Sequence, residues 1–171
     1  MSKRDLKKYL SGLDKIQLEE QILELYDKFI PVKTYYNFVF NPKEDQLAQA
    51  CKLKISIEYF PIIGKKAKAR RSVAQKYIKH FMTLGVDPFI IVDIMLYSIE
   101  IAQTFAGDKI IKQESFYKSM LHSFEQVISY MIENGILDEF HKRVLAINDK
   151  TVSQNWINYS EFNAIVARLE Y

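Results

Sequence analysis

The longest apolar stretch of the chain runs from Phe89 to Phe105, where nearly every position is hydrophobic. A helix that is apolar on all sides must be enclosed by other elements or by lipid. Asp93 and Glu100 interrupt this stretch, and it is shorter than the ~20 apolar residues that span a bilayer. We therefore expect an all-α, single-domain helical bundle of eight or nine helices around a central apolar helix at residues 88–105.

The residues before this stretch predict a sharp turn between two helices. Apolar positions repeat with helical spacing over residues 73–84, and Gly85 follows, where a left-handed residue commonly ends a helix. Asp87 and Pro88 come next, with an acceptor side chain suited to the N-cap and a proline suited to the first helical position. The sequence thus predicts a basic helix that ends at Gly85 and a central helix that begins at Pro88.

Apolar residues recur with helical spacing in most of the remaining chain as well. Asp14 and Gln17 have the spacing of a capping box, which predicts the start of a helix. Residues 43–60 fit an i, i+4 stripe and a strand-like alternation equally well, and their length favours a helix. The other predicted helices are 3–11, 14–30, 31–40, a long helix ending at Gly135, a helix from 137 to about 147, and a last helix with Trp156 on its inner face. The polar stretch 148–154 between the last two is expected to be a connection.

Length and termini limit the domain organisation and the cellular compartment. A chain of 171 residues predicts one domain, residues 1–171, in which residues 1–40 could form a semi-independent helical subdomain. Cys51 is the single cysteine, so no disulfide can form within the chain. The N-terminal residues MSKRDLKKYL lack the apolar core of a secretory signal. We expect a cytoplasmic protein that is not membrane-bound.

Several stretches resemble an uncharacterised bacterial family, of Bacteroidetes type, that carries only a domain-of-unknown-function label. The resemblance lies in MSKRDLKKYL, in KARRSVAQKYIKHF, and in LGVDP together with IMLYSIEIAQ. It implies a small, all-helical, cytoplasmic bacterial protein. It implies no activity and no site residues.

A run of basic residues is the clearest candidate for a binding site. Between Tyr59 and Val86 there are seven basic residues and no acidic residue, in a chain whose net charge is +3. Such a segment is typical of a phosphate-binding face, because lysine and arginine release counterions from a polyanion. Ser72 could cap the following helix and leave its first amides free for a phosphate. The candidate residues are Lys65, Lys66, Lys68, Arg70, Arg71, Lys76 and Lys79. Alternatively, acidic residues of the chain itself or of a protein partner neutralise these charges.

The central stretch offers a second candidate. Asp93, Tyr97, Glu100 and Thr104 share one stripe of the predicted helix. In apolar surroundings, carboxylates have raised pKa values unless they are paired, which is one way in which catalytic carboxylates arise. The alternative is a structural network in which each carboxylate meets a base such as Lys76, Lys79 or His80.

Other kinds of site have less support. His80, His122 and His141 fall on three different predicted helices, and a single His122–Glu125 pair is a weak metal motif. We assign no catalytic residue, no metal and no cofactor. The aromatic segment 31–40 carries Tyr35, Tyr36, Phe38 and Phe40, too many for one helix face, and an exposed patch there would suit a protein partner or a homo-oligomer.

We therefore expect a non-enzymatic binding module that uses the basic face 65–79, with nucleic acid or another polyanion as its ligand. The first alternative is a protein-interaction or scaffold subunit that uses residues 31–40. The second alternative is an enzyme built on Asp93 and Glu100.

Overall fold

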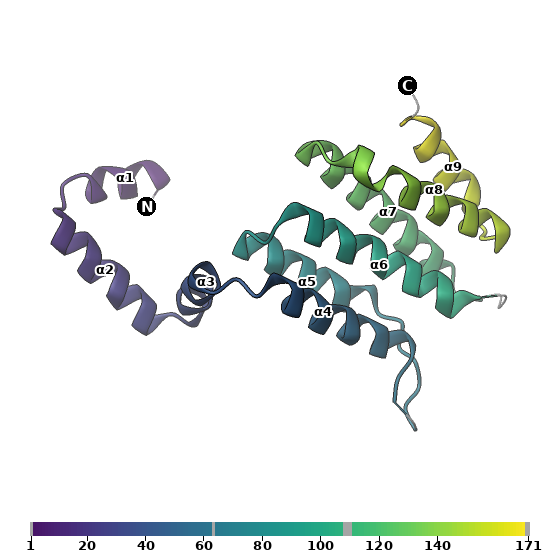
Figure 1. The fold of residues 1–171 in the computed structure, drawn as a ribbon, viewed down its shortest axis with the longest axis horizontal. Coiled ribbons are helices and arrows are strands. Elements are labelled where there is room, and N and C mark those ends of the chain that lie inside the picture. The colour runs from purple at the N-terminus through teal and green to yellow at the C-terminus, as the bar shows by residue number, and fades with distance from the viewer. Residues whose placement is uncertain (1, 63, 108–110, 170–171) are drawn as a thin grey trace. The chain divides into compact units, whose positions relative to one another are not determined.

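The computed structural model describes residues 2–62, 64–107 and 111–169. Over these residues it contains nine α-helices and no β-strand, which confirms the predicted all-α class (Figure 1). The chain divides into two compact units, residues 1–43 and residues 44–171. We call them the N-terminal unit and the C-terminal unit.

The N-terminal unit consists of three short helices, each begun by a local signal. They are α1 (Lys3–Leu10), α2 (Lys15–Lys28) and α3 (Ile30–Phe40). The predicted capping box is present at α2: the amide of Gln17 donates to Asp14 Oδ1 at 2.8 Å, and the amide of Asp14 donates to Gln17 Oε1 at 3.0 Å. Helices α2 and α3 pack against each other. No side chain of the three helices is fully buried, so this unit has no core of its own.

The C-terminal unit contains the core of the protein, arranged around one helix. Its helices are α4 (Glu44–Tyr59), α5 (Arg71–Leu84), α6 (Pro88–Ala106), α7 (Glu114–Asn134), α8 (Leu137–Ser153) and α9 (Tyr159–Ala167). Helices α4, α5, α7 and α8 all contact α6, and α9 packs against α7 and α8 (Figure 1). The prediction of a central helix at residues 88–105 is confirmed.

Helix α6 is enclosed as its composition requires. The side chains of Val92, Ile94, Leu96 and Ile99 are completely buried. In the described chain, α6 is also the one helix that is long and apolar enough to cross a membrane. Here protein surrounds much of its apolar surface.

The predicted turn between α5 and α6 is present in detail. Gly85 has φ +76°, in the left-handed region that favours glycine, and the Val86 amide donates to the Phe81 carbonyl at 3.1 Å. Asp87 Oδ1 accepts the Phe89 amide at 2.7 Å, and Pro88 occupies the first turn of α6. Gly135, with φ +66°, ends α7 in the same way. Both helix ends are therefore determined by local chemistry.

The segment 43–60 is helical, as expected, because its i, i+4 stripe is the buried one: Cys51, Ile55 and Tyr59 face the core of the C-terminal unit. The end of α8 was predicted wrongly. The polar stretch 148–154 is mostly helical, since α8 continues to Ser153. One of its polar residues, Thr151, is fully buried, and the Thr151 hydroxyl accepts a hydrogen bond from Gln103 Nε2 at 2.9 Å.

Trp156 lies in the turn between α8 and α9, before the last helix begins. It is nevertheless buried, and it packs edge-on against Phe116, Tyr117 and Phe162. The inward position of Trp156 was predicted correctly, whereas its placement on the last helix was wrong.

The enclosure of α6 predicts a large cost for shortening its side chains. Leu96→Ala removes a completely buried side chain and should lower the free energy of unfolding by about 2–5 kcal/mol, because it leaves a cavity. Leu53→Ala is the matched control, because Leu53 lies on α4 with 61% of its surface exposed and should change stability by less than about 0.5 kcal/mol. Urea unfolding measures both values. Equal effects of the two substitutions would contradict a core centred on α6.

Candidate functional site

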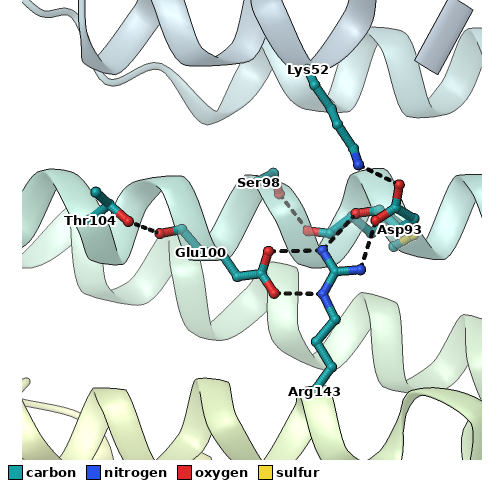
Figure 2. A network of polar contacts seen from close by, with 7 residues as sticks. Lys52, Asp93, Ser98, Glu100, Thr104 and Arg143 are labelled. Atoms are coloured by element: carbon teal, nitrogen blue, oxygen red, sulfur yellow. Dashed lines mark hydrogen bonds and ion pairs between the residues drawn. The ribbon is translucent and has the colours of Figure 1, made fainter. Parts of the chain in front are cut away.

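The two carboxylates of α6 are joined by one arginine from α8 (Figure 2). Arg143 Nη1 donates to Asp93 Oδ1 at 2.7 Å, and Arg143 Nη2 donates to Glu100 Oε2 at 2.8 Å. Arg143 Nε donates to the second oxygen of Glu100, which makes that contact bidentate. On the other side, Lys52 of α4 forms an ion pair with Asp93 Oδ2 at 2.5 Å. The network thus ties α6 to α8 and α4.

The charges of this network stabilise one another. Burial acts to raise the pKa of Asp93, but hydrogen bonds from Lys52 and Arg143 outweigh it, and the net pKa lies below the ordinary value. Burial acts to lower the pKa of Arg143, but its hydrogen bonds to Glu100 and Asp93 outweigh it, and the net pKa is raised. Both groups are therefore held in their charged forms.

This arrangement favours a structural role over a catalytic one. A general acid at neutral pH needs a raised pKa, whereas the pKa of Asp93 is lowered. Both carboxylates are already occupied by cations. The partners suggested from the sequence were Lys76, Lys79 and His80, and the structure places Arg143 and Lys52 there instead. All three suggested residues lie on α5, whereas the polar stripe of α6 faces α8 and α4.

The seven basic residues of the segment 65–79 do not form one set. Lys65, Lys66 and Lys68 lie in the loop before α5, and Lys76 and Lys79 lie one turn apart on α5. All five lysines are exposed, and none has an ion pair with a described residue.

The two arginines of the segment are engaged within the fold. Arg70 makes a bidentate ion pair with Glu58 of α4, from Nε to Oε2 at 2.8 Å and from Nη2 to Oε1 at 2.9 Å. Arg71 is turned inward, and its Nε donates to Ser123 Oγ of α7 at 2.6 Å. Glu58 falls within the predicted helix 43–60, but no pattern in the sequence indicates its pairing with Arg70.

Ser72 does not cap α5, so that prediction was wrong. The helix begins at Arg71, with Arg70 at the N-cap and no side-chain cap. The loop before α5 explains this start, because the amides of Lys68 and Ala69 both donate to the Glu58 carbonyl, at 3.0 and 2.9 Å. These bonds fix the loop against the end of α4 and place Ser72 inside the first turn.

Helices α5 and α7 line two pockets. A pocket of about 210 Å³ lies where both helices begin, lined by Lys68, Arg70, Arg71, Gln113, Ser115 and Ser119 among others. A larger pocket of about 380 Å³ lies further along the same helices, with Met95 of α6, Lys79, His122, Glu125 and Glu133 in its lining. His122 Nδ1 is 3.5 Å from Glu125, but no group of three metal-ligating side chains is found in the described parts of the chain.

The N-terminal unit exposes an unusual amount of apolar surface. Its large exposed hydrophobic residues are Leu6, Tyr9, Ile16, Ile22, Leu23, Leu25, Phe29, Ile30, Tyr35, Val39 and Phe40. Ile22, Leu23, Tyr26, Tyr36, Asn37 and Phe40 line a pocket of about 320 Å³ between α2 and α3. The predicted aromatic segment 31–40 contributes to this surface through Tyr35 and Phe40, which are exposed, and through Tyr36, which is half-buried.

A family model matches residues 1–170 of the chain. The chain belongs to DUF6155, a family of unknown function. The resemblance inferred from the sequence is thus confirmed at the level of the family. The DUF6155 match extends over both the N-terminal and the C-terminal unit, so both are part of what defines the family. No curated protein and no solved structure matches the chain.

The lowered pKa of Asp93 predicts how stability responds to acid. The folded pKa lies below the ordinary value, so the stabilisation from the ionised carboxylate is fully present above about pH 5 and is lost as the pH falls through the folded pKa. The difference in unfolding free energy between the wild type and Asp93→Asn should be constant from pH 7 to about pH 5 and shrink below about pH 4. Urea unfolding between pH 7 and pH 3 measures this difference. A difference that grows on acidification would contradict the lowered pKa.

Proposed function

We propose that this protein is a non-enzymatic binding module whose exposed lysines bind nucleic acid or another polyanion. The observation that supports the proposal is the set of five exposed lysines, Lys65, Lys66, Lys68, Lys76 and Lys79, none of which is paired with a carboxylate of the described residues. Three of them lie within four residues of the loop before α5, and the other two are exposed on α5.

Such lysines would bind by charge and not by sequence. Ammonium groups on flexible side chains neutralise phosphates and release counterions, which gives affinity that depends strongly on salt. Contacts to phosphates position a protein on nucleic acid without reading its bases. Arg70 and Arg71 are excluded from the proposed contact set, because Glu58 already holds the guanidinium of Arg70 and Arg71 is turned inward to Ser123 of α7. The surface is therefore smaller than the seven residues suggested by the sequence.

The salt dependence of binding tests the proposal. Contact with about three to five phosphates predicts a log–log salt slope of roughly −2 to −4.5, at ~0.7–0.9 per phosphate. Replacing Lys65, Lys66 and Lys68 together with serine should flatten the slope by about 2. Fluorescence anisotropy with labelled single-stranded and duplex oligonucleotides, at several salt concentrations from about 50 mM, measures the slope.

The matched control removes the same charge elsewhere. Lys118, Lys142 and Lys150 are exposed on α7 and α8, and replacing all three with serine should leave the slope unchanged. An equal loss in both triple variants would mean that net charge alone attracts the oligonucleotide. Absence of binding at about 50 mM salt would end the nucleic-acid proposal.

A second candidate function rests on the N-terminal unit, whose helices bury no side chain fully. Isolated helices of fewer than ~12–15 residues are marginal in water, so such a unit gains stability by covering its apolar surface. Helix α1 carries four basic residues and one acidic residue, whereas α2 carries four acidic and two basic residues. Two copies related by a twofold axis could pair α1 of each with α2 of the other. We infer that the partner of this surface is a second copy of the chain.

Two leucines of nearly equal exposure test this self-association. Leu23 on α2 is 63% exposed and lines the apolar pocket, and Leu53 on α4 is 61% exposed in the C-terminal unit. Leu23→Glu should abolish the dimer by placing a charge in an apolar contact, whereas Leu53→Glu should leave it intact. Sedimentation equilibrium measures the mass, and the dimer should weaken as salt rises. A wild-type protein that stays monomeric at about 100 μM would contradict the inference.

A further inference from the structure

Arg71 is a half-buried cation that has no ion pair with any residue in the described part of the chain. Its side chain crosses from α5 to α7, where Nε donates to Ser123 Oγ at 2.6 Å and Nη2 donates to Gln126 Oε1. Both acceptors are neutral. No carboxylate among the described residues forms an ion pair with Arg71. Its Nη1 makes no hydrogen bond with the described residues.

Arg143, which is also half-buried, differs from Arg71 in having carboxylate partners. Arg143 is similarly withdrawn from solvent, but two carboxylates hold it and its pKa is raised. The pKa of Arg71 is instead lowered, because burial disfavours its charge. Removing a charge from water without a counterion costs free energy, and an anion bound next to Arg71 would offset that cost.

Arg71 also lines the pocket of about 210 Å³ at the start of α5 and α7. Lys68 adds to the lining a second cation that is unpaired among the described residues, and Ser115 and Ser119 carry hydroxyl groups. The charge of Arg70 is already neutralised by Glu58. Of the nearby carboxylates, Glu58 is held by Arg70, and Glu114 lies 3.5 Å from Lys118. Among the residues that the structure describes, no acidic side chain lines the pocket.

The two helix ends at the pocket add to this positive character. Four pocket residues lie at the first turns of α5 and α7, namely Arg70, Arg71, Gln113 and Ser115. Neither helix has a side-chain cap hydrogen bond. Amides at a helix N-terminus attract anions, and here they reinforce the charge of Arg71.

We propose that the pocket lined by Lys68, Arg71 and Ser115 binds a single phosphate group, with Arg71 as its counter-cation. A tetrahedral dianion suits this lining, because the lining residues carry guanidinium, ammonium and hydroxyl donors and, among the described residues, no carboxylate. The phosphate is either inorganic phosphate or the terminal phosphate of a nucleic acid. The pocket would take it whether or not the exposed lysines bind a polyanion.

The first experiment uses inorganic phosphate as the probe. Thermal unfolding of the full chain is followed in phosphate and in chloride at equal ionic strength, and phosphate should raise the melting temperature of the wild type. Binding to the native state alone produces such a shift. Arg71→Met should abolish the response to phosphate. Lys142→Ser, an exposed change on α8, should leave it unchanged.

A second variant keeps the proposal testable if Arg71→Met folds poorly. Ser115→Glu places a carboxylate in the first turn of α7, where it favours the helix dipole and can reach the pocket. This variant should fold, melt no lower than the wild type, and lose the response to phosphate. A wild type with no phosphate response, or a response that survives in both pocket variants, overturns the proposal.

A third measurement identifies the source of the phosphate. Two oligonucleotides of one sequence are compared, one with a 5′-phosphate and one with a 5′-hydroxyl. About tenfold tighter binding of the phosphorylated oligonucleotide, lost in Arg71→Met, assigns the pocket to nucleic-acid ends. Equal affinities together with a response to inorganic phosphate assign it to free phosphate. Failure of both oligonucleotides to bind removes the lysine proposal and leaves the phosphate result intact.

Discussion

The enclosure of α6 is the constraint on which the rest of the C-terminal unit depends. A helix that is apolar on all sides cannot lie on a surface in water, and four helices contact it here. Asp93 and Glu100 nevertheless lie on this helix, so enclosure requires cations beside them. Arg143 and Lys52 meet that requirement, and they connect α6 to α8 and α4. The polar network is thus a consequence of how the core is built.

The same unit contains two half-buried arginines that differ in whether carboxylates neutralise them. The fold neutralises Arg143 with two carboxylates, whereas it surrounds Arg71 with neutral oxygens and a polar pocket. A charge that the fold neutralises contributes to structure, and a charge that it leaves unneutralised is available to a ligand. The proposed ligand site is therefore the pocket at the start of α5 and α7, and the carboxylates of α6 are assigned a structural role.

The N-terminal unit is stabilised by local interactions and lacks a buried core. Its helices have 8, 14 and 11 residues, well-formed capping boxes begin two of them, and no side chain in them is fully buried. Capping contributes roughly 0.5–2 kcal/mol per helix, which does not replace a core. The family match nevertheless includes this unit. Its exposed apolar residues and the opposite net charges of α1 and α2 are the basis of the proposed self-association.

Much of the fold could be predicted from the sequence because its signals are local. The apolar run of α6, the glycine at the end of α5 and the capping box of α2 each act within a few residues, and all three are present as expected. The end of α8 was predicted wrongly because its polar residues looked like a connection. Burial against Gln103, in α6, makes Thr151 part of a helix, and that contact joins residues 48 positions apart.

The candidate site, by contrast, was decided by tertiary structure. The sequence by itself determined that residues 65–79 are basic and that Asp93 and Glu100 share a helix face. It did not determine which of these charges are neutralised. Arg70 pairs with a carboxylate that is 12 residues away in the sequence, and Asp93 pairs with Arg143, which is 50 residues away. Pairing at such separations depends on which helices become neighbours around α6, and only the folded chain decides that.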